Sequence, residues 1–526
     1  MPNQNELTTQ FNTGTDMISG AVPSVVIIGA GISGLTAAYR LSQMFKRQGK
    51  KINIKVLDRS NKAGGVIDTQ KISGALLERG PESFLSSKPA IMDLIAELGL
   101  EQNLIESSGA CRKTLIASRG RLHALPDGFV LFAPTRMSSM AFSPLFSWPG
   151  KIRMGLDLLI PKRETGSDES LANFVKRRLG KEALDRLAEP LISGIYSGSP
   201  EVLSASATVP TLHELEQEFG SVIRGLWARS RAAKKARTGA QQINSTQTVG
   251  TPNACKNASV QLSAKPAARF LTFDKGMQLL VDALIERLPA DTIELSAPVR
   301  KILPGTSRRW QVHLVDNRAI DADAVIVATT AIQAAGLLDE VDAVLGNKLA
   351  AVPYNGAFIV NALYKRSDFP AEMNSSGFVV PRIENRVLRA CTFSSLKFAG
   401  RSRQDTLAIR LYARDAAEPP QLLVAGMIKD LQELLGITAQ PILIETATHE
   451  KAMPQYAVGH GARLKELQSL AYAIPGLALA GNAYLGIGIP DCITSGDNAA
   501  RKINDLLSYC SVNCSALSTG VKYACE

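Results

Sequence analysis

The chain has 526 residues, of which 45% are apolar and 20% charged, a composition typical of a globular protein of about two or three domains. A formal net charge of +11 would by itself indicate a nucleic-acid-binding protein. However, nine Lys and Arg residues and no acidic residue lie within 220–273, which leaves only +2 for the rest of the chain. The basic charge therefore belongs to one segment, and binding of nucleic acid by the whole protein is excluded.

Residues 1–22 are polar and lack the apolar core of a signal peptide, so they predict a disordered lead. No apolar run reaches the roughly 20 residues of a membrane span. The seven cysteines are scattered and form no Cys-x-x-Cys pair, which predicts free thiols in a reducing compartment and no protein-bound metal. We therefore expect a cytoplasmic protein, and peripheral contact with the inner face of the cell membrane stays open.

A glycine-rich turn follows the first apolar run of the chain. Residues 25–28 are uniformly apolar, which indicates a strand buried on both faces. Gly29, Gly31 and Gly34 then form Gly-x-Gly-x-x-Gly before an amphipathic helix, and a second short strand ends at Asp58. In such a βαβ unit a pyrophosphate approaches the backbone at the helix N-terminus and the carboxylate binds a ribose. The sequence therefore predicts a dinucleotide-binding site.

A glycine pair after Asp58 indicates whether the dinucleotide is FAD or NAD. Gly64 and Gly65 lie just beyond Asp58, where they let the chain fold back over the pyrophosphate. This arrangement is typical of flavoproteins with the glutathione-reductase type of Rossmann fold, and NAD dehydrogenases usually lack it. The apolar run "ADAVIVATTA" at 322–331 resembles a stretch of the same flavoproteins. FAD is therefore the predicted cofactor.

Four longer stretches carry a more specific signal. They are "LLERGPESFLSSKP" at 76–89, the run from "FVKRRLG" to "GSVIRG" at 174–225, "MPQYAVGH" at 453–460 and "GNAYLGIGIPDCITSGDNAA" at 481–500. These stretches resemble the oxygen-dependent protoporphyrinogen and coproporphyrinogen oxidases of haem biosynthesis, which belong to the FAD-containing amine-oxidase-like superfamily. The resemblance runs from about residue 25 to 507 and is closest to the bacterial coproporphyrinogen-oxidising branch.

The resemblance implies an α/β and α+β fold with a discontinuous Rossmann-type, glutathione-reductase-like FAD domain, a mixed-sheet substrate domain and a helical covering domain. The expected boundaries are a disordered lead at 1–22, FAD-binding parts at 23–89, 269–334 and 456–508, a helical covering domain at 90–220, a flexible basic insertion at 231–268, a substrate-binding domain at 335–455 and a polar tail at 509–526. A helix that starts near Asn498 is expected to aim its N-terminus at the flavin edge where negative charge develops on reduction.

The activity implied by the resemblance is oxidation of a porphyrinogen. The flavin takes hydride from a meso carbon and is reoxidised by O2 with release of H2O2, and three such rounds give the porphyrin. The implied partners are therefore the porphyrinogen, O2 and the next enzyme of the haem pathway, which would receive the product. Monomer and homodimer both stay open. The rival functions are another oxidoreductase of the superfamily, such as an amine oxidase or a carotenoid desaturase, and a non-catalytic porphyrin-binding relative.

The expected FAD contacts come from both ends of the chain and from its middle. They are Gly29, Ala30, Gly31, Ile32, Ser33, Gly34, Asp58, Arg59, Gly64, Gly65, Gly80, Pro81, Glu82, Ser83, Val299, Gly481, Ile487, Gly488 and Ile489. The flavin does the chemistry, and no catalytic side chain is assigned. Gly194 is expected to orient the tetrapyrrole through its carbonyl, against the alternative of a helix C-cap. Lys88 is a candidate for binding a propionate, against the alternative of a solvated surface charge.

Three positions depart from the family pattern. Asp58 replaces the usual Glu, and His449 stands where close relatives often have Trp. The arginine that follows Glu-Leu-Gly-Leu in the mitochondrial enzymes has only Arg112 as a counterpart. Cys492 is expected to be a small buried thiol rather than a point of covalent flavin attachment.

Overall fold

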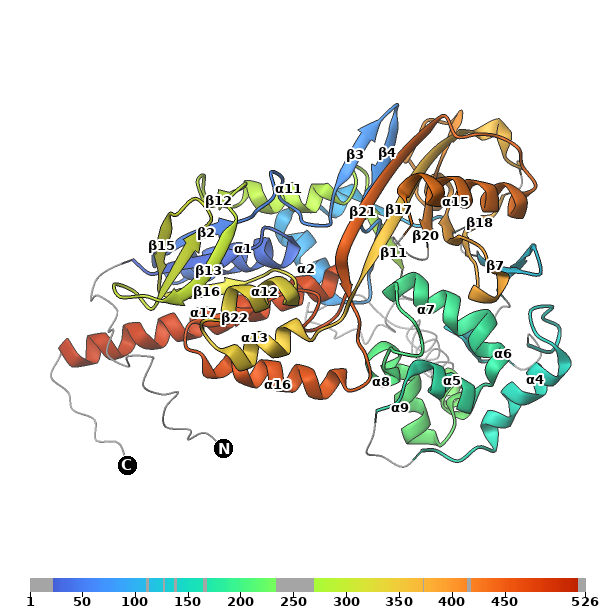
Figure 1. Ribbon diagram of the computed structural model, residues 1–526, viewed down its shortest axis with the longest axis horizontal. Helices are drawn as coiled ribbons and strands as arrows, with labels where there is room; N and C mark the ends of the chain where they lie inside the picture. Colours follow the sequence, from blue (N-terminus) through green and yellow to red (C-terminus); the bar gives the residue numbers. More distant parts are fainter. Residues whose placement is uncertain are drawn as a thin grey trace, which may run out of the picture.

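The structure is a computed structural model that describes residues 22–109, 113–125, 128–136, 140–163, 168–232, 269–371, 373–413 and 418–518. The predicted lead at 1–22 and the predicted insertion at 231–268 lie almost entirely outside these described residues, as does Arg112. The described chain has three parts (Figure 1): an α/β part, a large sheet beside it, and a group of helices below that sheet.

A five-stranded parallel sheet forms the centre of the α/β part. Its strands, in spatial order, are β12 (Ile293–Glu294), β2 (Asn53–Leu57), β1 (Ser24–Ile28), β16 (Ala324–Val327) and β22 (Leu477–Leu479). Every residue of β1 is buried, because alternate side chains of the strand pack into two different cores, one on each face of the sheet. This strand order confirms the predicted Rossmann-type domain.

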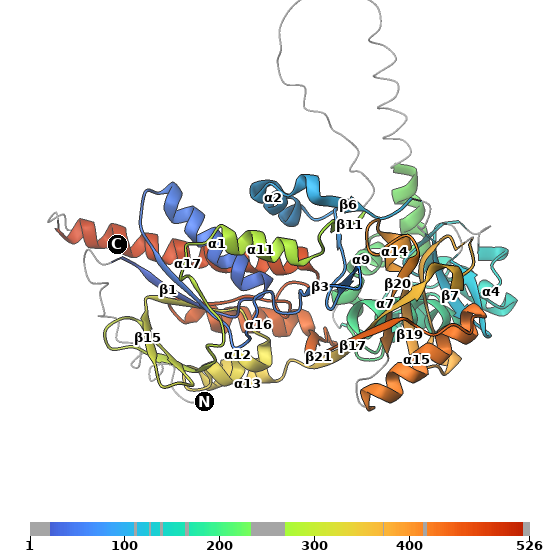
Figure 2. The same ribbon diagram turned by 90° about the horizontal axis from the view of Figure 1, so that it is seen from above.

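Different elements cover the two faces of this sheet, as Figure 2 shows. One face packs against α1 (Ile32–Arg47), α2 (Pro89–Leu98), α11 (Gln278–Glu286) and α17 (Ile489–Ser518). The other face packs against the antiparallel strands β13 (Val299–Pro304), β14 (Trp310–Leu314) and β15 (Ala319–Ala322), and against α12 (Ala331–Leu338), α13 (Ala343–Ala350) and α16 (His460–Ala473).

The second part is a seven-stranded sheet. Its strands, in spatial order, are β21 (Leu443–Pro454), β17 (Tyr354–Lys365), β20 (Thr406–Ala413), β19 (Leu388–Thr392), β18 (Ser375–Val379), β7 (Lys113–Ser118) and β8 (Arg121–Ala124). Only the β18–β7 pair is parallel, so the predicted mixed sheet is confirmed. Alternate residues of β17, among them Val360 and Tyr364, point into a core that α15 (Pro420–Leu435) closes.

The third part is helical. It contains α4 (Trp148–Gly155), η3 (Leu156–Leu158), α5 (Leu171–Arg178), α6 (Lys181–Ala183), η4 (Leu184–Ala188), α7 (Glu189–Tyr196), α8 (Ala205–Thr208) and α9 (Pro210–Phe219). The connecting elements are β3 (Thr69–Ile72), β4 (Ala75–Glu78), β5 (Phe84–Leu85), η2 (Glu101–Asn103), β6 (Leu104–Glu106), β9 (Phe129–Val130), β10 (Ala133–Pro134), β11 (Phe270–Phe273), η5 (Arg366–Asp368), η6 (Arg382–Glu384) and α14 (Ser394–Lys397).

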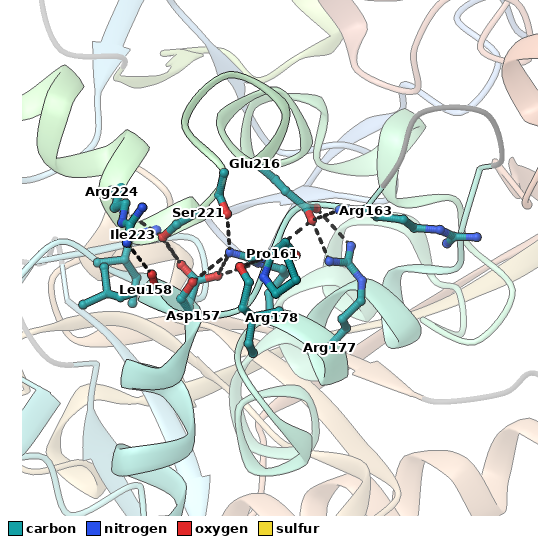
Figure 3. Close-up of polar contacts among 12 residues, drawn as sticks. Asp157, Leu158, Pro161, Arg163, Arg177, Arg178, Glu216, Ser221, Ile223 and Arg224 are labelled. Carbon is teal, nitrogen blue, oxygen red and sulfur yellow. Dashed lines mark hydrogen bonds and ion pairs between the residues drawn. The ribbon is translucent and has the colours of Figure 1, made fainter.

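A buried ion pair holds the helical part together (Figure 3). Arg178 and Asp157 both have fully buried side chains, and Arg178 Nε donates to Asp157 Oδ1 at 2.5 Å. The same guanidinium donates to the carbonyl oxygens of Ile160, Pro161 and Gly220. Asp157 Oδ2 accepts hydrogen bonds from the segment after α9, through the Ser221 hydroxyl at 2.6 Å and a backbone N–H. One ion pair therefore joins η3, α5 and the end of α9.

The structure corrects several predicted boundaries. The helical domain does not begin at residue 90, because α2 packs against α1, α11 and α17, while β7 and β8 belong to the seven-stranded sheet. The substrate domain does not begin at 335, because α12 and α13 share a core with the nucleotide-type sheet. The last helix begins at Ile489 rather than near Asn498, and it continues to Ser518, into the segment predicted as a polar tail.

Candidate functional site

The predicted phosphate turn lies at the end of β1. Gly31 is the N-cap of α1, and a Cβ added there would meet no atom within 4 Å. The other two glycines of the motif have no such space. A Cβ on Gly29 would lie 2.6 Å from the Ala328 carbonyl oxygen, and a Cβ on Gly34 would lie 1.9 Å from the Gly29 carbonyl oxygen. The protein is therefore packed tightly around the turn but leaves the space above Gly31 open, as the approach of a pyrophosphate requires.

The glycine pair folds back against this turn. Gly64 N–H donates to the Ala30 carbonyl at 2.9 Å, and Gly31 and Gly64 form an isolated parallel bridge. Gly64 and Gly65 both have positive φ, at +116° and +62°. Both conformations favour glycine, so the pair can make a tight loop directly beside Gly31.

The carboxylate of Asp58 also faces the glycine turn. Asp58 Oδ2 accepts a hydrogen bond from the Ala30 N–H at 2.7 Å, and Oδ1 accepts one from the Ser60 N–H at 2.8 Å. The Asp58 carbonyl accepts from the Ala297 N–H, which brings the start of β13 and Val299 to the same end of the sheet. The carboxylate of Asp58, whose side chain is shorter than the usual Glu, thus lies at the edge of the sheet where the resemblance expects the ribose and the adenine. Arg59 is exposed next to it.

The predicted contact segment 80–83 lies between the two sheets. A Cβ on Gly80 would lie 1.6 Å from the Val66 carbonyl oxygen, so glycine is needed for this close approach to the loop that follows Gly64 and Gly65. The buried Glu82 side chain points away from that loop toward α14, where Ser394 donates to Oε1 and Lys397 Nζ lies 3.0 Å from Oε2. The Glu82 carboxylate therefore joins the α/β part to the seven-stranded sheet.

The ion pair between Glu82 and Lys397 predicts how the stability of the protein depends on pH in acid. Burial alone would raise the pKa of Glu82, but the charges of Lys397 and Arg410 and the hydrogen bonds from Ser394 and Lys397 outweigh it and lower the pKa to about 2. A lowered pKa contributes stability that is present above the ordinary value of 4.5 and is lost as the pH falls toward 2. We therefore expect Glu82→Gln to lower the free energy of unfolding at pH 7 by ~3 kcal/mol.

Urea unfolding of both proteins at a series of pH values measures this effect. The difference between Glu82→Gln and the unsubstituted protein should be full at pH 7 and should shrink between about pH 4.5 and pH 2. Glu433→Gln, which removes an exposed carboxylate that also pairs with an arginine, is the control and should change little. If the difference in free energy of unfolding between the two proteins were the same at pH 7 and pH 3, the lowered pKa of Glu82 would be contradicted.

The C-terminal contact stretch lies next to the phosphate turn. The segment from Gly481 to Gly488 connects β22 to α17, and Gly481 has φ +139°. The first turn of α17 starts at Ile489, where Pro490 has no N–H and the N–H groups of Asp491 and Cys492 donate to the Gly488 carbonyl at 2.9 and 3.0 Å. The start of the helix therefore offers mainly the partial positive charge of its N-terminus. The helix thus begins nine residues earlier than predicted, so that Ile487 and Gly488 directly precede its N-terminus and Ile489 is its first residue.

Two helices cross at the centre of the site. The buried Ser33 hydroxyl on α1 donates to the Cys492 carbonyl on α17 at 3.0 Å, so its side chain serves packing between the two helices. A Cβ on Gly496 would lie 2.3 Å from the Ser33 carbonyl oxygen. Cys492 is the buried thiol that was predicted, and burial raises its pKa to about 12. The N-termini of both helices are therefore held close together.

Sequence reasoning missed Ser495 and Gly496. The Gly481 N–H donates to the buried Ser495 hydroxyl at 3.0 Å, which fixes the contact stretch onto α17. The signal that could have found Gly496 is the spacing of small residues, since Cys492, Gly496 and Ala500 recur every fourth position, whereas this spacing does not include Ser495. Such spacing on one helix face indicates a close helix crossing.

The two substrate-side candidates lie on different elements. Gly194 is exposed within α7, where a Cβ would meet nothing within 4 Å, and the C-cap of this helix is Ser197, so the alternative of a helix C-cap is wrong. Lys88 is the N-cap of α2 and pairs with Asp491 in the first turn of α17, on the wall of a groove of about 650 Å³. Burial and the Asp491 carboxylate raise the pKa of Tyr196 to about 12, so the end of α7 and the start of α17 are within electrostatic reach.

His449 lies on β21, close to segment 80–83. Its Nε2 donates to the Arg79 carbonyl at 2.6 Å, so it joins the seven-stranded sheet to the same loop as Glu82. No group of three His, Cys, Asp or Glu residues that could hold a metal ion occurs within the described ranges. The residues present fit FAD, because an open glycine turn, a carboxylate at the ribose edge and a second helix N-terminus lie along one end of the parallel sheet.

Comparison with known proteins gives a consistent answer. A sequence model of the flavin-containing amine oxidoreductases matches residues 32–504. The chain is 31% identical over 492 residues to the coproporphyrinogen III oxidase of Bacillus subtilis (strain 168), covering 92% of this chain and 98% of that protein. It is 33% identical over 489 residues to the coproporphyrinogen III oxidase of Propionibacterium freudenreichii subsp. freudenreichii, covering 91% and 90%.

Solved structures show the same fold. A structure from Exiguobacterium sp. 255-15, of a protein provisionally named protoporphyrinogen oxidase, superposes with a TM-score of 0.76 at 26% identity, covering 93% of this chain and 99% of that one. Cyclohexylamine oxidase from Brevibacterium oxydans IH-35A shares the fold at a TM-score of 0.61 and 16% identity, covering 93% and 100%. The family match and the 33% identical relative together show that the chain belongs to the flavin-containing amine oxidoreductase family and is an FAD-dependent oxidoreductase.

Proposed function

We propose that the protein oxidises coproporphyrinogen III to the porphyrin in haem biosynthesis, with FAD as cofactor, O2 as acceptor and H2O2 as product. The observation that carries this proposal is the extent of the similarity. The coproporphyrinogen III oxidases are 29–33% identical over 91–92% of the chain, so the match includes the seven-stranded sheet and the helical part. Amine oxidases of the same fold reach only 15–16% identity.

In this proposal FAD, when bound, supplies the oxidising chemistry, and the chain supplies binding and orientation. The open turn at Gly31 receives the pyrophosphate, and Asp58 receives a ribose hydroxyl. The N-terminus of α17 presents a partial positive charge to the flavin. Gly194 orients the tetrapyrrole through its carbonyl, and Lys88, once released from Asp491, binds a propionate.

The experiment is anaerobic mixing of the purified yellow protein with each porphyrinogen, followed by admission of O2. Bleaching of the flavin by coproporphyrinogen III, then porphyrin fluorescence and H2O2, is the expected result. Bleaching by protoporphyrinogen IX alone would move the protein to the other branch. A flavin that both porphyrinogens leave oxidised but that an amine or a carotene bleaches would favour the rival oxidoreductases, and porphyrin binding without any bleaching would favour the non-catalytic relative.

Contact with a membrane surface forms part of the proposal. Within the described residues, no helix combines the length and apolarity needed to span a bilayer. However, Trp148, Ile152, Leu156 and Leu159 follow helical spacing along α4 and η3 with exposed side chains, Trp148 at 67% and Leu159 at 78%. We call these four residues the outer apolar stripe. Among the basic side chains of 140–163, Lys162 is exposed, Arg153 and Arg163 are half-buried and Lys151 is buried, and the one acidic side chain, Asp157, is buried against Arg178.

An outer apolar stripe flanked by basic residues favours an anionic lipid surface. We expect the protein to co-sediment with vesicles that contain phosphatidylglycerol, and Trp148→Ser/Leu159→Ser to weaken this binding by about 10-fold or more, since each apolar side chain contributes ~1.5–3 kcal/mol when buried. Val344→Ser, at an exposed position of α13, is the matched control. Equal binding by all three proteins, or equal binding to neutral vesicles, would contradict the proposal. Handover of the product, and a monomeric or homodimeric state, stay predictions of the resemblance.

A further inference from the structure

The segment from Gln455 to His460 lies where the three parts of the molecule meet. The Gln455 N–H donates to the Pro353 carbonyl at 2.8 Å, just before β17. The Tyr456 carbonyl accepts from the Ser204 N–H at 2.7 Å, and the Val458 N–H donates to the Val202 carbonyl at 3.1 Å. The backbone of this segment therefore joins the large sheet to the helical part.

The side chain of Tyr456 reaches into the α/β part. Its hydroxyl donates to the Asn482 carbonyl at 2.5 Å, and the residue is only 4% exposed. Its ring stacks on His460, with centroids 4.0 Å apart and planes at 15°, and lies tilted against Tyr196 at 6.0 Å. Burial raises the pKa of Tyr456 above its ordinary value, so the hydroxyl remains a hydrogen-bond donor across the physiological range.

Asn482 belongs to the stretch that faces the flavin in the proposed function. Its side chain donates to the Ala452 carbonyl at 2.9 Å, and the preceding Gly481 is bound to Ser495 on α17. The stretch is thus held on one side by α17 and on the other by β21 and Tyr456. The hydroxyl of Tyr456 links the stretch around Asn482 to the 455–460 segment, whose backbone is hydrogen-bonded to the helical part.

Nearby polar groups keep the ring of Tyr456 in place. Asp168 Oδ2 accepts from the Gly459 N–H at 2.8 Å, and its Oδ1 accepts from the hydroxyls of Ser204 and Ser206, both at 2.9 Å. Burial and the charge of Arg463 lower the pKa of His460 to about 4, so the stacked ring is neutral at pH 7. The segment that carries Tyr456 is therefore held by hydrogen bonds to Asp168, and a neutral imidazole stacks on its ring.

We propose that Tyr456 is a positioning residue, whose hydroxyl fixes the Gly481–Tyr484 stretch against the flavin and transmits the position of the helical part to it. This inference rests on the proposed function only for the identity of the group that the stretch faces. It requires that loss of one hydroxyl loosens the stretch while the fold stays intact.

The test compares Tyr456→Phe with Tyr364→Phe. Tyr364 is a fully buried tyrosine in β17 whose hydroxyl has no hydrogen-bond partner among the residues that the structure describes, so the control removes the same atom without breaking an observed bond. Amide hydrogen exchange of peptides covering 480–486 is measured with and without FAD, together with FAD affinity, the flavin absorption spectrum, and kcat and KM. We expect Tyr456→Phe to speed exchange in these peptides and to weaken FAD binding by about 3- to 10-fold, as the loss of one buried hydrogen bond implies.

The outcomes separate the possible failures. Faster exchange without FAD, seen only in Tyr456→Phe, supports the positioning role even if neither porphyrinogen is oxidised, in which case the proposed function alone fails. A lower kcat with an unchanged KM further supports positioning of the flavin rather than of the substrate. Exchange, affinity and spectrum equal to those of Tyr364→Phe would overturn the inference, because Tyr456 would then only fill space.

Discussion

Replacing Gly31 by valine is expected to give a folded protein that no longer retains FAD. Gly31 has φ −72° and ψ 175°, a conformation that any residue adopts, and a Cβ there meets no protein atom within 4 Å. The substitution therefore costs the fold little and fills only the open space above the turn. If the pyrophosphate occupies this space, FAD affinity should fall by about 100-fold or more.

The measurement is the flavin-to-protein ratio after purification, followed by titration of the apoprotein with FAD. Gly336→Val is the control, because Gly336 is an exposed glycine inside α12 and a Cβ there also meets nothing within 4 Å. Both variants should show circular dichroism and apoprotein melting temperatures close to those of the unsubstituted protein. Full flavin content in Gly31→Val would place the pyrophosphate elsewhere.

Replacing Arg178 by leucine is expected to cause the largest loss of stability. Arg178 and Asp157 are both fully buried, and the substitution leaves the Asp157 carboxylate in the core without its cation (Figure 3). It also removes the donors for four backbone carbonyls, in or near η3 and just after α9. Breaking a buried pair in this way costs about 3–5 kcal/mol.

Urea unfolding measures this loss, and limited proteolysis locates it in the helical part. Arg178→Lys keeps the charge but loses the planar array of donors, and it should give an intermediate loss. Lys181→Ala, which removes an exposed ion pair with Asp185 in the same part, should cost less than about 0.5 kcal/mol. An Arg178→Leu protein as stable as Lys181→Ala would show that the pair contributes nothing to the fold.

The N-terminal half of the candidate FAD site could be predicted because its signal is local. The buried strand, the three glycines and Asp58 follow one another within one βαβ unit, and each residue type has a physical reason at its position. The start of α17 was placed too late, because Gly486, Gly488 and Pro490 interrupt the helical pattern although Pro is well tolerated in a first helical turn.

The pairing of strands that are far apart in the sequence could not be predicted. β7 joins β18 in parallel across a long stretch of chain, and nothing in the residues of β7 specifies that partner, so the segment was assigned to the helical domain. Polar residues of the core were missed for a related reason. Asp157 and Arg178 look like surface charges in the sequence, and Tyr456 looks like one more core aromatic until Asn482 is placed beside it.

The discontinuous sheet constrains how the protein is made. β22 pairs with β16, and α17 packs across α1, so an edge of the parallel sheet and the first helix of the chain are completed only by the last tenth of the chain. The Ser33–Cys492 hydrogen bond alone spans 459 positions. Until β22 and α17 have been synthesised, the apolar faces of β16 and α1 that they contact stay uncovered. Exposed apolar surface and unpaired strand edges of this kind make a nascent chain prone to aggregation. A chain that ends before β22 is therefore expected to leave the β16 edge of the sheet and one face of α1 uncovered.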